Sequence, residues 1–445
     1  MDYRGRSRLI FGLVAVLIAS LILDTIISKV YYFSFSQSPL TWRIVLFIVI
    51  GAVFMSTTYF ISDFVRNRSK EIRALDSLHI ASLDKLTAIS RYLLTFIIGV
   101  IIFEMLVTTR YNVYILALAT WISYTTGISM MVLLASQFLL WFKSNKHVVV
   151  LFYGLSSAVL AINLCFILAF VTAMLMNTSA YSEPHIAYIS PFINLGPLGS
   201  VLTYGYQASS IASFMIWWIG TVFILQHYSG KSRRKRSWII LSLPLFYFLI
   251  QFQPLFLNIF STFLESEPVL FSTLYTLAFT LSKPIGGILF SLVFLSIAKK
   301  IGDNDRVKKY IIISAFGLVL VFVSNQATVL VSAPYPPFGL ATISSLALGS
   351  YLVVVGIYSS ALSVAQDSNL RKTIRQYTLN EAKLLDNIGT AVMENELQRR
   401  VMKITKQHRD VLTQQTGIES TFSDDDAKNY LHEVMEEIHK GSIKH

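Results

Sequence analysis

The stretch Val148–Met176 reads VVVLFYGLSSAVLAINLCFILAFVTAMLM and contains no charged residue. It is longer than the roughly 20 apolar residues with which a helix crosses the hydrocarbon core of a bilayer. Similar apolar blocks recur along the chain on both sides of it, separated by shorter charged segments. A water-soluble fold would instead show amphipathic patterns with a period near 2 or 3.6. The pattern therefore predicts an all-α, polytopic transmembrane helical bundle.

The composition also indicates a membrane protein. Of the 445 residues, 54% are hydrophobic and 14% are charged, and the mean hydropathy is +0.58. Soluble domains carry roughly 25% charged residues. The single cysteine, Cys165, lies inside an apolar block. One cysteine excludes an internal disulfide framework, a thiolate-rich metal site and a CxxC redox pair.

The apolar blocks predict about ten spans in a transmembrane domain over residues 1–365. A tail over residues 366–445 follows this domain. The expected spans are 9–30, 43–63, 92–109, 112–142, 148–176, 204–228, 238–260, 271–298, 310–332 and 339–365.

The loop charges give this arrangement a direction. Segments on the expected inner side hold 21 Lys and Arg residues, whereas those on the outer side hold only Lys29, Arg43 and Arg110. Cytoplasmic loops are enriched in Lys and Arg, and a missed span would invert every loop after it. We therefore expect a multi-pass protein of the plasma membrane with both termini in the cytoplasm. The same rule accounts for the net charge of +12 without a nucleic-acid partner.

Motifs for catalysis are missing from the sequence. It contains no HExxH, no GxSxG and no P-loop, and its histidines form no outward-facing cluster. His408-Arg409-Asp410 lacks the Leu and the Asn that complete a kinase catalytic loop. We therefore expect no enzymatic activity, no metal and no cofactor.

Polar residues within the spans are the candidates for a binding site, because a charge in hydrocarbon is costly unless it is paired or faces water. Asp24, Glu104 and Lys283 lie in the first, third and eighth spans. Together with nearby amides, most of them fall in the outer halves of their spans, which predicts a pocket that opens outward. The alternative is interhelical hydrogen bonding plus a salt bridge from Lys283 to Asp24 or Glu104. The amides of this candidate site are Gln251, Gln253, Asn325 and Gln326.

The run Ser282-Lys283-Pro284-Ile285-Gly286-Gly287 lies in the middle of the eighth span. Proline removes a backbone donor and clashes with the preceding turn, and the two glycines weaken the helix further. We predict a broken helix with candidate hinges at Pro284, Gly286, Gly287 and, on the preceding span, Pro254. A static kink with close packing at the glycines is the alternative.

The tail shows apolar residues at roughly heptad spacing, including Leu397, Val401 and Ile404. A further amphipathic helix is expected after Gly417. Such a seam is typical of a coiled coil or of a helix that docks on a partner. We predict that residues 370–438 bind a cytoplasmic partner or a second copy of the chain.

One tail segment carries a resemblance. Residues 387–400 read NIGTAVMENELQRR and directly follow a multi-helix, sensor-like membrane region. In this the chain is similar to uncharacterised polytopic membrane proteins of archaea. The resemblance implies an archaeal plasma membrane, a receptor-like bundle and a short signalling or assembly tail. It transfers no functional residue, and the chain lacks the phosphoacceptor helix and ATP-binding domain of sensor kinases.

Three functional hypotheses follow. The first is a membrane receptor or sensor that binds a small ligand, ion or lipid from the outer side and signals through its tail. The second is a secondary transporter that uses the same residues with alternating access, which would require a polar path to the inner side. The third is a structural membrane subunit, in which the polar groups only join helices.

Overall fold

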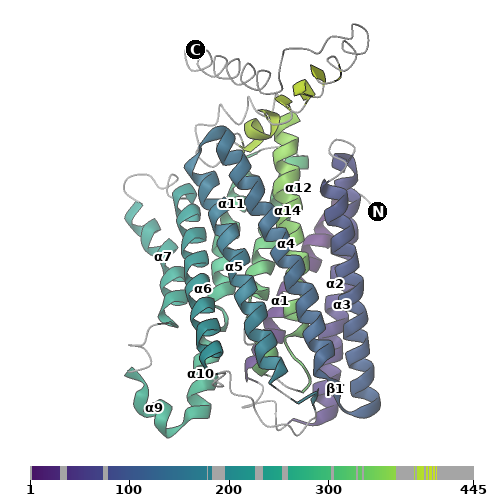
Figure 1. The fold of residues 1–445 in the computed structure, drawn as a ribbon, viewed down its shortest axis with the longest axis vertical. Coiled ribbons are helices and arrows are strands. Elements are labelled where there is room, and N and C mark those ends of the chain that lie inside the picture. Colours follow the sequence, from purple (N-terminus) through teal and green to yellow (C-terminus); the bar gives the residue numbers. More distant parts are fainter. Residues whose placement is uncertain are drawn as a thin grey trace, which may run out of the picture.

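The computed structural model is a bundle of long helices that lie side by side (Figure 1). It describes residues 3–30, 38–73, 79–177, 179–182, 196–225, 234–252, 259–301, 305–326, 329–332 and 335–366, and individual residues between 385 and 407. Within these residues the fold is all-α, apart from one pair of two-residue strands.

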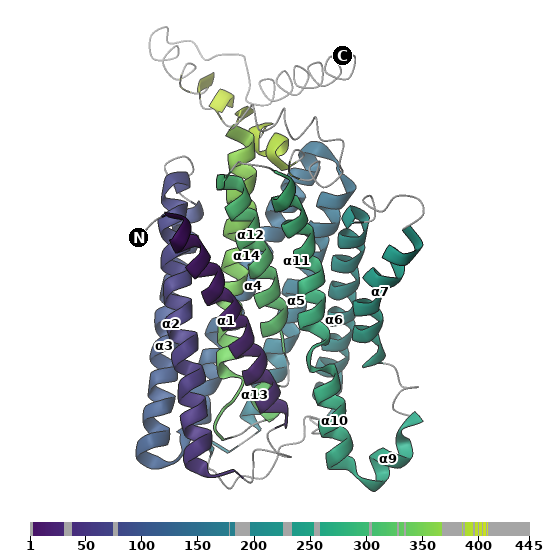
Figure 2. The same cartoon turned by 180° about the vertical axis from the view of Figure 1, so that it is seen from behind.

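The chain passes up and down the bundle in sequence order (Figures 1 and 2). Its elements are α1 (Tyr3–Val30), α2 (Leu40–Arg73), α3 (His79–Thr108), β1 (Tyr111–Asn112), α4 (Val113–Asn145), α5 (Val148–Met176), β2 (Tyr181–Ser182), α6 (Gly196–Leu225), α7 (Arg234–Ile250), α9 (Ser261–Ser266), α10 (Pro268–Thr280), α11 (Ser282–Lys300), α12 (Asp305–Ser324), α13 (Val329–Ser332) and α14 (Leu340–Gln366).

Nine helices in the described part of the chain are long and apolar enough to cross a membrane. The expected seventh span is represented by α7, whose apolar part, Trp238–Ile250, is shorter. Two other expected spans are interrupted. Residues 271–298 divide between α10 and α11, and residues 310–332 divide between α12 and α13.

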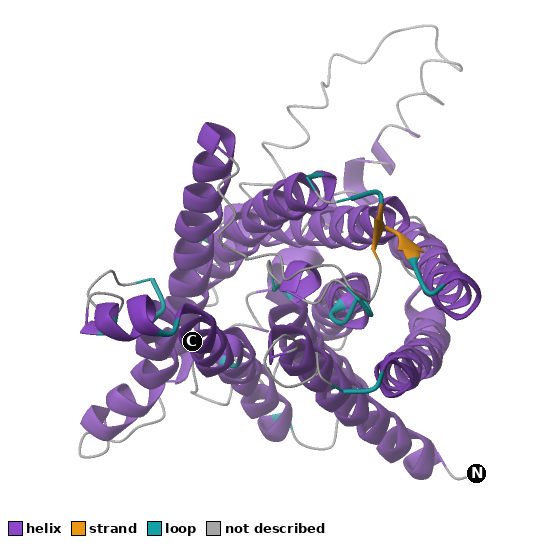
Figure 3. Cartoon of the chain, turned by 90° about the horizontal axis from the view of Figure 1, so that it is seen from below, coloured by secondary structure: helices purple, strands orange, loops and turns teal. Residues whose placement is uncertain are grey.

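We name the two ends of the bundle by what lies there. At the hairpin end, β1 and β2 pair antiparallel, with Tyr111 opposite Ser182. Asn112 then caps α4, because its side-chain oxygen accepts from the N–H of Tyr114 at 2.8 Å. The tail end is the opposite one, where α14 finishes and the tail begins (Figure 1). Viewed along the bundle, the outer helices surround inner ones (Figure 3).

The innermost helix is α14, which is buried along its whole apolar length. It contains no charged residue, so it can be surrounded by other helices without burying an unpaired charge. Gly317 of α12 and Gly349 of α14 let these two helices touch through their backbones. A Cβ atom at Gly317 would lie 2.7 Å from the backbone nitrogen of Val353. Small residues serve membrane helices in this way by permitting close approach.

The first described residues of the tail pack on the end of α14. Ile388 and Ala391 are buried, and Gly389 lies so close to Val364 that an added Cβ would come within 2.6 Å of it. The side chain of Glu394 accepts a hydrogen bond from the Ser144 hydroxyl at the end of α4. In the predicted seam, Leu397 and Ile404 are 46% and 54% exposed. Residues 370–384 and 408–438 of that seam lie outside the described residues.

Candidate functional site

Two helix interruptions meet inside the bundle. The first separates α10 from α11 at Leu281, and the second follows Ser324, where Asn325 and Gln326 are no longer helical. Pro284 lies in the first turn of α11. A proline cannot donate to the carbonyl four residues earlier, here that of Thr280. The side-chain amide of Gln326 donates to that carbonyl instead, at 3.4 Å.

Lys283, at the first interruption, contacts Asn325 at the second. Its ammonium donates to the backbone carbonyl of Asn325 at 2.8 Å and lies 3.4 Å from the Oδ1 atom of the same residue. It also lies 5.1 Å from the ring centre of Tyr206, within the range of a cation–π interaction. The carbonyl follows the C-terminus of α12, where the helix dipole favours a positive charge.

Asn163 of α5 extends this network into two further helices. Its Oδ1 atom accepts from the Asn325 amide at 3.1 Å. Its own amide donates to the Ser209 hydroxyl at 3.0 Å and to the Tyr206 carbonyl at 3.3 Å, both on α6. Asn163 is fully buried. It therefore links the α12 interruption to α5 and α6.

A second lysine reaches the same network from α1. The Lys29 ammonium donates to the Gln326 Oε1 atom at 3.2 Å. Lys29 is partly buried in the last turn of α1, towards the hairpin end. We call these residues the lysine cluster: Lys29, Asn163, Lys283, Asn325 and Gln326.

The charge of the lysine cluster is unbalanced in the described part of the chain. Both ammonium groups are held by carbonyl oxygens and an aromatic ring, and neither forms an ion pair with a described carboxylate. Lys283 is 5% exposed. A buried cation is costly unless an opposite charge or a hydrogen-bonding group compensates it. The arrangement is suited chemically to an anion, which the two ammonium groups could receive.

Asp24 lies elsewhere. Its carboxylate accepts from the N–H of Gly339 at 2.8 Å, and from the N–H and the hydroxyl of Thr342 at 3.0 and 2.9 Å. These groups are at the start of α14, so Asp24 supplies the negative charge that a helix N-terminus favours. The salt bridge to Lys283 that the sequence left open is not formed.

Glu104 lies at the hairpin end. Its Oε2 atom accepts from the N–H of Asn112 at 2.9 Å, which ties the end of α3 to the turn before α4. No ion pair joins it to Lys283 within the described residues. Like Asp24, Glu104 orders a neighbouring chain segment in this structure, and the participation of either in ligand binding stays a prediction.

The candidates of the seventh span are only partly described. Gln251 follows α7, where its side-chain amide donates to the Phe248 carbonyl at 2.8 Å and its backbone carbonyl accepts from the Tyr275 hydroxyl. This connects the end of α7 to α10, away from the contacts of Lys283 given above. Gln253 and Pro254 lie outside the described residues.

The two glycines after Pro284 are positions of close packing. A Cβ atom at Gly286 would lie 2.2 Å from the Phe214 ring, and one at Gly287 would lie 2.7 Å from the Cβ of Phe322. Phe214 is itself stacked on Phe248, with ring centres 4.1 Å apart. These contacts agree with the static alternative for this stretch, and its role as a hinge stays a prediction.

Of the predicted residues, the structure brings Lys283, Asn325 and Gln326 together, and it adds Lys29 and Asn163. The sequence contained a signal for Asn163, because it is the one amide in the otherwise apolar block Val148–Met176. Lys29 gave no such signal, since a lysine at a span end is explained by topology alone. No group of three or more His, Cys, Asp or Glu that could hold a metal occurs among the described residues.

In comparisons with known proteins, no family model, no curated protein and no solved structure matches this chain.

Proposed function

We propose that the chain is a membrane receptor of the sensor type, whose lysine cluster binds a small anion that enters from the hairpin end. The observation that carries the proposal is the buried ammonium of Lys283, held at the junction of two interrupted helices by carbonyl oxygens and an aromatic ring. An ionisable residue inside the membrane marks a functional site by default. Lys29, nearer the hairpin end, adds a second cation on the route of entry.

The proposal includes a topology of ten crossings, in which the 17-residue helix α7 counts as one. Ten crossings bring both termini to the tail end. Lys143, Lys146 and Lys299 also belong to that end, whereas Arg43 and Arg110 belong to the hairpin end. By the positive-inside rule, the tail end is cytoplasmic in a plasma membrane. The anion then approaches from outside the cell, and the tail lies inside.

The proposed signal is a change in how the two interruptions pack. Lys283 and Gln326 each reach across to the other interruption, so an anion that draws Lys283 away from the Asn325 carbonyl weakens one of the two links. A ligand shifts a conformational equilibrium only by its differential affinity for the two states. The change in packing reaches the cytoplasm through α14, which packs closely on α12. The tail rests on the end of α14.

A secondary transporter is the second candidate, because discontinuous helices at mid-depth are how many transporters expose backbone groups to a substrate. Here α10/α11 and α12/α13 are both interrupted. A transporter moves the anion to the tail end, whereas a receptor does not. Flux of a labelled anion into proteoliposomes that contain the purified protein separates the two.

The binding site is tested by thermal unfolding of the full chain in nanodiscs with a panel of small anions, including acetate, phosphate and sulfate. We expect at least one anion to raise the unfolding temperature of the wild type and not that of Lys283→Met. Lys299→Met is the matched control, since it removes the same charge from an exposed position on the same helix. An equal anion response in wild type and Lys283→Met would overturn the proposed site.

A further inference from the structure

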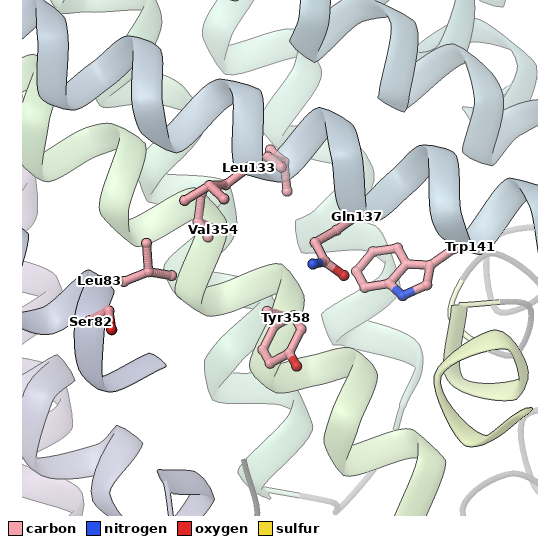
Figure 4. A pocket seen from close by; sticks show the side chains of 8 residues that line it. Ser82, Leu83, Leu133, Gln137, Trp141, Val354 and Tyr358 are labelled. Carbon is pink, nitrogen blue, oxygen red and sulfur yellow. The ribbon is translucent and has the colours of Figure 1, made fainter. Parts of the chain in front are cut away.

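A second site lies near the tail end, on the side of the bundle away from Lys29. It is a pocket of about 200 Å³ between α3, α4 and α14 (Figure 4). Small-molecule sites in proteins measure roughly 300–1,000 Å³, so this pocket encloses only part of a larger ligand. The residues that line it are Ser82, Leu83, Leu133, Leu134, Gln137, Trp141, Val354 and Tyr358.

The pocket changes character along its length. By the rise of 1.5 Å per residue, Leu133 lies roughly 18 Å along α4 from its last residue, and Trp141 roughly 6 Å. Leu133, Leu134 and Val354 form the part of the pocket farther from the tail end, which is apolar. Ser82, Trp141 and Tyr358 lie nearer the tail end. Tryptophan and tyrosine prefer this depth, where a membrane meets water.

Gln137 lies at the transition between the two parts, and its side chain extends into the pocket (Figure 4). No described residue forms a hydrogen bond with its amide. An amide that faces hydrocarbon without a partner costs several kcal/mol, so this position is suited to a ligand that brings its own polar group. An acceptor such as an ester carbonyl meets the donors of Gln137.

The pocket opens towards the lipid. Leu133, at its mouth, is 41% exposed, and the neighbouring Leu86 of α3 and Leu140 of α4 are also exposed. In a helix that crosses a membrane, exposed leucines contact acyl chains. Two exposed lysines lie on the helices that wall the pocket, Lys85 three residues after Ser82 and Lys143 three residues after the exposed Leu140. Lysines at this depth attract anionic lipid head groups.

We infer that this pocket is a binding site for an anionic phospholipid. One acyl chain lies against Leu133, Leu134 and Val354, the ester carbonyl accepts from Gln137, and the head group lies between Lys85 and Lys143. Trp141 is near Ser144, which holds Glu394 of the tail. The lipid therefore occupies the place where the membrane domain contacts the tail. The site is separate from the lysine cluster and does not rest on the proposed function.

The test uses the full chain in phosphatidylcholine nanodiscs that contain a phosphatidylglycerol with a photoactivatable diazirine in its acyl chain. We expect cross-links concentrated in the peptides that contain Leu133–Trp141 and Val354–Tyr358. Leu133→Trp fills the mouth and should reduce this labelling about fivefold or more. Leu139→Trp is the matched control, because Leu139 is 44% exposed on the same helix and does not line the pocket. Labelling spread evenly over the lipid-facing helices, or unchanged in Leu133→Trp, overturns the site.

A replacement variant and a second lipid probe complete the test. If Leu133→Trp does not fold, as judged by gel filtration, Gln137→Leu replaces it, and labelling equal to wild type again overturns the site. A phosphatidylcholine probe with the same chain tests the head group. Lys85→Gln with Lys143→Gln should lower the preference for phosphatidylglycerol roughly fivefold for each lysine. Equal labelling by both probes in the wild type overturns the assignment of an anionic lipid.

Discussion

The Gln326 side-chain amide donates to the backbone carbonyl of Thr280 across the two helix interruptions, with 3.4 Å between Nε2 and the oxygen. That carbonyl is available because Pro284, four residues later, has no N–H. Lys283 crosses in the opposite direction to the Asn325 carbonyl. Each interruption therefore supplies the hydrogen-bonding group that the other lacks. The two broken helices form one unit, which explains how a proline is accommodated deep in an apolar bundle.

This reciprocity predicts a coupling between Pro284 and Gln326. In the wild type, Gln326→Leu removes the hydrogen bond from Gln326 to the Thr280 carbonyl and should lower the free energy of unfolding by about 1–2 kcal/mol. In a Pro284→Ala background, residue 284 can donate to Thr280, so the same substitution should cost less. A double-mutant cycle on thermal or denaturant unfolding measures the difference. Additive effects of the two substitutions would show that the contact carries no coupling.

Asp24 should contribute to stability through α14. In Asp24→Asn the side chain is neutral and has only one acceptor oxygen, whereas the carboxylate receives three hydrogen bonds from Gly339 and Thr342. We expect a loss of about 1–3 kcal/mol, the usual size for charge-assisted hydrogen bonds. The measurement is circular dichroism during thermal unfolding in nanodiscs. Asp63→Asn is the control, because Asp63 is exposed and bonds only Asn67 among described residues at 3.0 Å. Equal losses in both variants would contradict the capping role.

Two glycines should respond to alanine in opposite ways. Gly286→Ala places a Cβ atom against Phe214, whose ring is fixed by stacking on Phe248, so we expect a loss of about 1–3 kcal/mol. Gly99→Ala meets nothing within 4 Å in the middle of α3 and should be neutral or stabilising by up to about 1 kcal/mol. Unfolding temperatures of the two variants compare the sites directly. A neutral effect at Gly286 would mean that the Phe214 ring is free to move.

Hydropathy and loop charge could predict the all-α bundle, because both depend on composition within a segment and not on which neighbour a side chain faces. The same information placed Asp24 and Glu104 in the outer halves of their spans and Lys283 near the middle of its span. Depth along a span does not determine direction around the helix axis. Asp24 faces the start of α14 and Glu104 the turn before α4, so neither bonds Lys283. Asn325 and Gln326 could be grouped with Lys283 because they are polar residues just outward of the middle of the largely apolar ninth span.

The tail should associate through its exposed seam. Leu397 and Ile404 are seven residues apart and both exposed, the spacing of a coiled-coil seam. Chemical cross-linking of the full chain in nanodiscs, or capture of a cytoplasmic helix partner, should depend on them. We expect Leu397→Glu with Ile404→Glu to reduce the cross-linked species several-fold. Gln398→Glu with Gln407→Glu adds the same charge and removes no apolar side chain, so this control should retain it. Equal reduction in both pairs would assign the effect to charge.

A carboxylate placed inside the lysine cluster should act as a built-in competitor of the proposed ligand. Asn163→Asp keeps the number of non-hydrogen atoms and the oxygen that accepts from Asn325, while it adds a negative charge near Lys283 and removes the amide that donates to Ser209 and the Tyr206 carbonyl. The variant should remain folded without ligand, because the new charge offsets that of the lysine and compensates for the two lost hydrogen bonds. Its response to any anion that stabilises the wild type should fall at least tenfold in apparent affinity, which about 1.4 kcal/mol of competing interaction produces.

Thermal unfolding across a titration of that anion measures the shift, with Asn163→Leu for comparison. The leucine variant removes the hydrogen bonds to Ser209 and the Tyr206 carbonyl, so it should be destabilised without ligand by about 1–2 kcal/mol. An Asn163→Asp protein that binds the anion as tightly as the wild type would place the ligand away from Lys283. A protein stabilised by the aspartate and insensitive to anions confirms that the cluster takes one negative charge.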